Sequence, residues 1–174
     1  PITIKKKHKI RFVMLQSLPY IGMAPMYGVS DFPTRIWIFL SSGCQNMTTP
    51  FLRLTETFPK DFPKEWAPDL MLKDVKDSIG FKTVPQFMTN SSDLFLKNAD
   101  KILQYTSEVE LNCGCPSSNA VGKGAGSSLL IDPKYFGSFI ENIVKNIGEK
   151  TLSVKMRTGY NSDDDYQNLI QVLN

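Results

Sequence analysis

The feature that most constrains the fold of this 174-residue chain is a regular alternation of strand patterns and helix patterns after residue 83. Short runs typical of strands are separated by stretches whose apolar residues recur at helical spacing, and each of these stretches opens on a capping residue. We expect strands at Val84–Met88, Glu108–Cys113 and Thr151–Arg157, and helices starting at Ser91–Asp93, Asp132-Pro133 and Asp163–Asp165. This alternation indicates βαβ units, which build a parallel sheet.

The faces of the last two expected strands distinguish between the two common architectures built from βαβ units. Each strand has one apolar face and one polar face. The polar faces carry Glu108, Glu110 and Asn112 in one strand, and Ser153, Lys155 and Arg157 in the other. A central strand of a doubly wound sheet is covered by helices on both sides and is apolar on both. One polar face fits helices outside and a ligand chamber inside, which favours a (β/α)₈ barrel.

The first half of the chain supplies earlier units of the same barrel. Ile21–Met26 reads as a strand, Asp31 caps a helix with Pro33 in its first turn, and Thr48–Thr55 reads as a further strand. We therefore expect a partial TIM (β/α)₈ barrel of about five βα units, because a full barrel takes about 250 residues. We divide the chain into a basic segment, 1–18, and the N-terminal portion of a barrel, 19–174, with its later units absent. The edge of the last strand is expected to be open.

The net charge of +3 is concentrated at the N-terminus. Positions 1–11 contain five basic residues and no acidic residue, and the rest of the chain contains 15 basic and 17 acidic residues. The sequence contains no run of about 18 apolar residues, so it predicts no membrane-spanning helix. Three cysteines are an odd number, which fits a reducing cytoplasm better than a disulfide scaffold. We expect a cytoplasmic protein whose basic character belongs to this N-terminal segment.

The segment Glu110-Leu111-Asn112-Cys113-Gly114-Cys115-Pro116-Ser117 ends a strand and enters a loop with glycines at 122, 124 and 126. Together with Ala24–Asp31 and Val154–Gly159, it resembles the tRNA-dihydrouridine synthases, in the order in which that family carries these blocks. The doubled cysteine and Phe51-Leu52-Arg53 most resemble the bacterial C-type branch. The resemblance runs from about Pro19 to the end of the chain.

The resemblance implies a flavin-binding barrel that reduces uridine to 5,6-dihydrouridine in the D-loop of tRNA, with FMN as cofactor and NADPH as reductant. It implies that Cys115 is the general acid at C5 of uracil and that Asn112 holds the uracil. It also implies flavin contacts at Pro25, Met26, Tyr27, Gln86 and Lys155. Arg53 and Arg157 are candidate RNA contacts, because arginine suits phosphates and base edges. The expected partner is tRNA, without a membrane, a metal or an obligate protein partner.

The residues alone leave alternatives open at each position. A free cysteine is most often buried structure, and Cys113, which alternates with Asn112, is expected to pack against the helices. Cys-x-Cys with Cys44 and His8 offers a metal reading, although structural zinc prefers a Cys-x₂₋₄-Cys spacing. Lys155, Gln86 and the two arginines also fit solvated or ion-paired roles. The three loop glycines fit a mobile loop that closes over substrate better than a dinucleotide fingerprint.

Two other functions also fit the resemblance. One is a flavin barrel that acts on a free pyrimidine, and the other is a truncated, inactive half-barrel that binds RNA. Phosphate sites in barrels of this kind are usually formed by loops after the seventh and eighth strands, which have no counterpart in these residues. We therefore expect this span by itself to bind FMN weakly and to be inactive.

Overall fold

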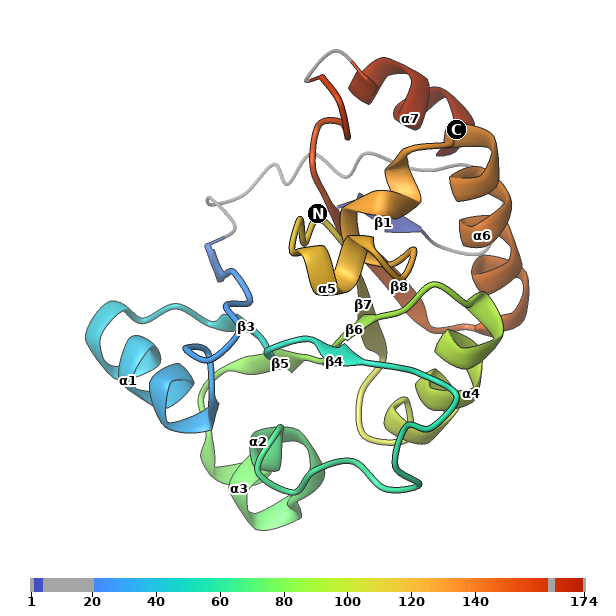
Figure 1. Cartoon of the computed structure of the whole chain (residues 1–174). Coiled ribbons are helices and arrows are strands. Elements are labelled where there is room, and N and C mark those ends of the chain that lie inside the picture. Colours follow the sequence, from blue (N-terminus) through green and yellow to red (C-terminus); the bar gives the residue numbers. More distant parts are fainter. Residues whose placement is uncertain (1, 5–20, 163–164, 174) are drawn as a thin grey trace.

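The computed structural model describes residues 2–4, 21–162 and 165–173, and its strands and helices follow one another in βα order (Figure 1). The strands are β1 (Ile2–Ile4), β2 (Gly22–Met23), β3 (Asn46–Thr48), β4 (Leu52–Arg53), β5 (Lys82–Val84), β6 (Gln86–Met88), β7 (Glu108–Cys113) and β8 (Thr151–Met156). The helices are α1 (Phe32–Ser42), α2 (Pro68–Met71), α3 (Lys73–Ser78), α4 (Ser92–Ile102), α5 (Ser118–Val121), the 3₁₀ helix η1 (Gly126–Leu130), α6 (Pro133–Asn146) and α7 (Tyr166–Leu173).

The strands form two sheets, ordered β2-β3-β5 and β1-β8-β7-β6-β4, in which every pair except β1–β8 is parallel. The two sheets share one path, because β5 and β6 are a single strand path divided at Pro85, which has no N–H to donate. The Glu110 N–H donates to the Pro85 carbonyl oxygen at 2.9 Å and keeps the divided path beside β7. The result is five neighbouring parallel strand paths, each followed by helices.

The helices α1 to α4, α6 and α7 lie around these paths, whereas α5 lies over β7 and β8 near the centre of the view (Figure 1). The apolar residues of β7 and β8 pack into one large core against α4 and α6, with Leu111, Leu152, Phe95, Phe136 and Ile143 among its buried members. The opposite faces of β7 and β8 pair Glu110 with Ser153 and Asn112 with Lys155 in register. This is the expected fold class: a partial TIM-barrel-like α/β structure of five βα units with its polar strand faces inside.

Helix starts agree with the capping residues in the sequence. Asp31 accepts the Thr34 N–H at 3.0 Å, Ser91 accepts the Leu94 N–H at 3.2 Å, and Asp132 accepts the Lys134 N–H at 2.9 Å. Each side chain satisfies a backbone donor that has no partner within the first turn of its helix.

Four of the five expected strands have different bounds. The strand expected at Ile21–Met26 is limited to Gly22–Met23, and the one expected at Thr151–Arg157 ends at Met156. Prolines divide the other two. The strand expected at Val84–Met88 begins at Lys82 and breaks at Pro85, and the one expected at Thr48–Thr55 is divided into β3 and β4 around Pro50. In both cases a proline removes a ladder donor from the strand. The expected glycine loop contains two short helices, α5 and η1, on either side of a turn in which Gly124 has a φ of 70°.

The expected open edge is wrong along part of β8. Strand β1 pairs with it in antiparallel register, with Ile2 opposite Val154 and Ile4 opposite Leu152. A strand edge presents unpaired backbone donors and acceptors, and a short β-branched segment such as β1 can satisfy them. The basic residues Lys5–Arg11, expected to form a charged tail, lie outside the described residues.

Candidate active site

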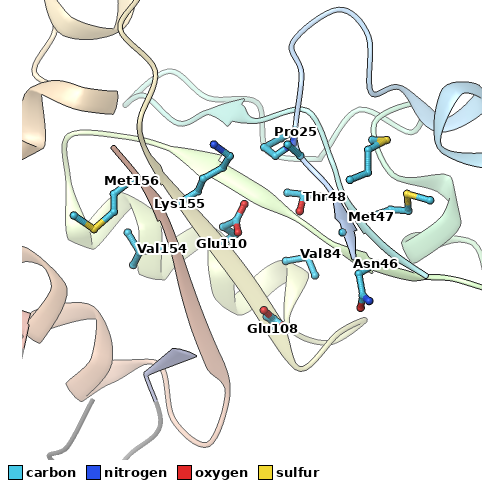
Figure 2. A pocket seen from close by; sticks show the side chains of 13 residues that line it. Pro25, Asn46, Met47, Thr48, Val84, Glu108, Glu110, Val154, Lys155 and Met156 are labelled. Atoms are coloured by element: carbon cyan, nitrogen blue, oxygen red, sulfur yellow. The ribbon is translucent and has the colours of Figure 1, made fainter. Parts of the chain in front are cut away.

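A cavity of about 430 Å³ lies on the inner side of the sheet, between the first strand paths and the last (Figure 2). Its walls come from both sheets: Gly22, Met23, Ala24, Pro25, Asn46, Met47, Thr48, Val84, Glu108, Glu110, Val154, Lys155 and Met156. In Figure 2, Glu110 and Lys155 lie on one side of the cavity, and Pro25 and Thr48 lie on the other. The cavity therefore occupies the chamber that the polar strand faces predicted.

The ionisable groups Glu110 and Lys155 give this cavity its chemical character. Burial raises the pKa of the Glu110 carboxyl above its ordinary value, while a hydrogen bond from Gln86 and the positive charge of Lys155 act in the opposite direction. The Lys155 side chain is exposed, and within the described residues its ammonium has no hydrogen bond or ion pair. The cavity thus offers one unpaired cation beside a carboxyl whose charged form burial disfavours.

A chain of hydrogen bonds runs from the Glu110 carboxyl to the backbone before Cys115. Gln86 Nε2 donates to Glu110 Oε1 at 2.6 Å, and Asn112 Nδ2 donates to Gln86 Oε1 at 2.9 Å. Asn112 Oδ1 accepts the Gly114 N–H at 3.1 Å and the Cys115 N–H at 3.0 Å. Backbone N–H groups only donate and an ionised carboxylate only accepts, so both ends of the chain favour the same orientation of the two amides.

Cys115 lies just beyond β7, and its loop is held from two sides. Its thiol is partly exposed, with Sγ 3.4 Å from Ser117 Oγ, and its carbonyl oxygen accepts the Ser127 N–H at 2.9 Å. Gly126 has a φ of 65°, and a Cβ there would lie 2.6 Å from the Cys115 carbonyl oxygen. The close approach of η1 to the Cys115 loop therefore requires glycine at position 126.

Cys113 has the packing role expected for it. Its side chain is fully buried in the main core, and burial raises the pKa of its thiol far above the ordinary range. Cys44 is also buried. Cys115 is therefore the accessible thiol among the three cysteines, all of which are described.

The two arginines expected to contact RNA lie at the same end of the strands as Cys115. Arg157 follows β8, and its Cγ lies 3.7 Å from the position that a Cβ of Gly114 would take. Arg53 is opposite Met88 in the β4–β6 register, and Met88 belongs to a small cluster against which Cys115 packs. Within the described residues neither guanidinium has a hydrogen bond or an ion pair.

The other expected flavin contacts do not all reach the cavity. Pro25 lines it, whereas Met26 and Tyr27 are exposed and do not, and Tyr27 stacks on Phe51 instead. Gln86 is fully buried and does not line the cavity, but it donates a hydrogen bond to Glu110, which does. The roles assigned to these residues by resemblance stay predictions.

Glu110 is the functional candidate that the sequence did not single out. It lies two residues before Asn112, on the same polar face of β7, and period-two spacing is the signal that identifies it. Among the described residues no cluster of three metal-ligating side chains could hold a metal ion, and no helix is long and apolar enough to cross a membrane. His8, part of the alternative metal set, lies outside the described residues.

Comparison with known proteins gives a consistent result. A family model described as dihydrouridine synthase (Dus) matches residues 22–174. The chain is 29% identical over 150 residues to the tRNA-dihydrouridine(16) synthase of Haemophilus ducreyi, covering 84% of this chain and 46% of that protein. It is 28% identical over 142 residues to a probable tRNA-dihydrouridine synthase of Helicobacter pylori, covering 75% of this chain and 43% of that protein.

A yeast relative extends the comparison to eukaryotes. The tRNA-dihydrouridine(20) synthase [NAD(P)+] of Saccharomyces cerevisiae is 25% identical over 154 residues, covering 78% of this chain and 40% of that protein. The chain spans less than half the length of these relatives. The names of the Haemophilus and Saccharomyces relatives carry different numbers, 16 and 20, and the Helicobacter name carries none. Assignment to the C-type branch therefore stays a prediction. The match over residues 22–174 shows that the chain belongs to the dihydrouridine synthase (Dus) family.

Proposed function

We propose that residues 19–174 are the N-terminal portion of a flavin-binding barrel whose complete form reduces uridine in the D-loop of tRNA to 5,6-dihydrouridine, using FMN and NADPH. Family membership supports the reaction class, because the relatives' names describe it. The observation that carries the proposal is the position of Cys115. A partly exposed thiol lies where β7 ends, and a hydrogen-bonded chain connects its backbone with a carboxyl in the cavity wall.

The residues around the cavity fit the ring system of FMN. Lys155 offers an ammonium that is free of protein partners within the described residues, and the electron-rich edge of a reduced flavin attracts a cation. Pro25 and Thr48 lie across the cavity from it. FMN, when bound, would supply the hydride that adds to C6 of uracil.

The chain's own residues provide the proton and the positioning. The Cys115 thiol donates a proton to C5 of the uracil, and at neutral pH an ordinary cysteine thiol is mostly protonated and can serve as an acid. Asn112 fixes the Cys115 backbone by accepting its N–H. Arg53 and Arg157 bind RNA phosphates or base edges. The target uridine must leave its stack, since its ring faces are covered in a helix.

The remaining expectations complete this proposal. The enzyme acts in the cytoplasm on tRNA, and it needs no metal and no obligate protein partner. The D-loop as target and the preference for NADPH follow from the resemblance, and the relatives' names support the use of a nicotinamide cofactor only for those proteins.

The test compares two neighbouring cysteines in the full-length protein that contains this chain. With NADPH and tRNA that lacks dihydrouridine, the wild type should form dihydrouridine, measured by mass spectrometry of digested tRNA. Cys115→Ala should slow formation by about 100-fold or more while the flavin is still reduced by NADPH, since a general acid contributes on that scale. Cys113→Ala is the matched control and should retain most of the rate. Equal losses in the two variants, or a wild type that forms no dihydrouridine, would contradict the proposal.

A further inference from the structure

Tyr27 and Phe51 form an aromatic pair that the proposed chemistry leaves without a role. Their ring centroids are 5.3 Å apart and the rings are inclined by 24°, which is a stacked arrangement. Tyr27 is 78% exposed, whereas Phe51 is partly buried against Met88, Ala120 and Ala125. Phe51 thus anchors the pair to the protein, and Tyr27 presents a large aromatic surface to solvent.

The turn that carries Tyr27 is fixed by hydrogen bonds. Ser30 Oγ accepts the Met26 N–H at 2.8 Å and donates to the Met26 carbonyl oxygen at 2.9 Å, and the Ser30 N–H donates to the same oxygen. The buried Arg35 guanidinium holds the Ser30 carbonyl oxygen at 2.7 Å. Gly28 has a φ of 74°, which a residue with a Cβ rarely adopts. An exposed ring on a rigid turn loses little conformational entropy when a ligand stacks on it.

The pair lies beside the candidate acid. Phe51 and Cys115 pack against the same small cluster of Met88, Ala120 and Ala125. Pro25, in the cavity wall, precedes Tyr27 by two residues, so the two Cα atoms are at most about 7 Å apart. Arg53 follows Phe51 by two residues. The stacking surface and the thiol therefore share one small cluster, and residues two positions from the pair supply a cavity-wall residue, Pro25, and a cation, Arg53.

We propose that Tyr27 and Phe51 are a stacking platform for an unpaired RNA nucleobase that neighbours the uridine presented to Cys115. This site rests on the proposed function, because it takes tRNA as the ligand. Aromatic side chains beside cationic ones are the usual means of holding unpaired RNA, in which bases stack on rings while the phosphates meet arginine and lysine. Every base has an aromatic face, so the platform tolerates any base next to the uridine.

The test measures RNA affinity of the full-length protein with two probes: a fluorescent single-stranded oligouridylate and a labelled tRNA that lacks dihydrouridine. Tyr27→Ala should weaken binding of both probes by about 5- to 150-fold, the range for one lost base stack. Tyr27→Phe keeps the ring and should bind within about twofold of the wild type. Trp37→Ala is the matched control, since Trp37 is an equally exposed aromatic, at 76%, on the outer helix α1. It should bind RNA as the wild type does.

Salt dependence separates stacking from charge. Tyr27→Ala should lower affinity without changing the slope of log affinity against log salt, because tyrosine neutralises no phosphate. Arg53→Gln should reduce that slope if its guanidinium meets a phosphate. Wild-type affinity in Tyr27→Ala would overturn the platform. So would a loss of bound flavin in Tyr27→Ala with RNA affinity unchanged, because Tyr27 would then be a cofactor contact.

The outcomes also separate the platform from the reaction. A wild type that forms dihydrouridine while Tyr27→Ala binds RNA normally rejects the platform alone. Weakened RNA binding in Tyr27→Ala, together with a wild type that forms no dihydrouridine, supports the platform and rejects the reaction. A wild type that binds neither probe overturns the platform.

Discussion

Two buried polar clusters in this fold differ in where their hydrogen bonds end. The closed cluster is centred on Arg35 and Asp69, both almost fully buried. The open chain runs from Glu110 through Gln86 and Asn112 to the backbone of Cys115. The first joins secondary structure elements to one another, whereas the second joins a cavity wall to a loop that carries a partly exposed thiol.

The closed cluster pairs its groups with one another and with the backbone. Arg35 donates to Asp69 from two nitrogens, at 2.9 and 2.5 Å, and to the carbonyl oxygens of Ser30 and Trp66. Asp69 also accepts the Thr83 hydroxyl at 2.7 Å. These bonds tie α1, α2 and β5 together and end in no group that faces the Glu110–Lys155 cavity. This is the arrangement expected of a charge pair that holds a fold together.

The open chain has a reactive group at each end. Glu110 lines the cavity at one end, and the loop held at the other end carries the Cys115 thiol. The buried amides of Gln86 and Asn112 have hydrogen-bond partners. They do not form the hydrophobic core, which the apolar faces of β7 and β8 supply. Lining a cavity does not by itself mark a site, because Asp69 and Thr83 of the closed cluster line a second cavity of about 450 Å³. The comparison teaches that a buried polar chain marks a candidate site when its hydrogen bonds also lead to an accessible reactive group, here the Cys115 thiol.

The largest expected effect on stability comes from breaking the closed cluster. Asp69→Ala leaves the buried Arg35 guanidinium without its carboxylate and should lower the free energy of unfolding by about 3–5 kcal/mol. Urea unfolding of the full-length protein, followed by circular dichroism, measures the loss. The double variant Arg35→Met with Asp69→Leu removes both charges and should recover most of it. A loss below about 1 kcal/mol in Asp69→Ala would show that the pair contributes no more than a surface ion pair does.

The sequence predicted the fold well where its local signals were strong. Strand Glu108–Cys113 has the observed bounds, and the caps Asp31, Ser91 and Asp132 start the helices they were expected to start. Local signals suffice there because capping and period-two burial depend on neighbouring residues. The pairing of β1 with β8 depends on partners distant in sequence, which no local pattern specifies.

The same distinction between local and distant signals applies to the site residues. The motif around Cys115 located the candidate acid, and strand alternation separated Cys113 from it. The sequence did not predict the Arg35–Asp69 ion pair, because its members are 34 residues apart and each resembles an ordinary surface charge. The resemblance assigns Tyr27 to the flavin, and this role stays a prediction; in the structure its exposed ring stacks on Phe51. Sequence order locates a loop, but tertiary packing decides which way its side chains point.

A smaller effect on stability is expected when the open chain is cut at its Cys115 end. Asn112→Ala removes the acceptor of the Gly114 and Cys115 N–H groups and should cost about 1–3 kcal/mol of stability, the range for unsatisfied buried donors. The freed loop should also let iodoacetamide alkylate Cys115 faster, which peptide mass spectrometry can follow because Cys44 and Cys113 are buried. Asn146→Ala, on the exposed side of α6, is the control and should change neither quantity. An unchanged alkylation rate in Asn112→Ala would mean that Asn112 does not hold the thiol's loop.

The smallest expected effect concerns the cavity end of the open chain. Burial raises the pKa of Glu110 above its ordinary value of 4.5, so the folded state holds this proton more tightly than the unfolded state. The resulting stabilisation is complete below about pH 4.5 and is lost as the pH rises through the pKa of the folded state. Glu110→Gln cannot ionise and should not show this loss. The stability of the wild type relative to Glu110→Gln should therefore fall as the pH rises from 4.5 towards neutrality.

Urea unfolding at each pH measures this difference in stability, with the exposed Glu149→Gln as a control whose difference from the wild type should not follow this course. Parallel profiles for the wild type and Glu110→Gln would place the Glu110 carboxyl in an environment as polar as water, and the contrast between a closed cluster and an open chain would then rest on the Cys115 end alone.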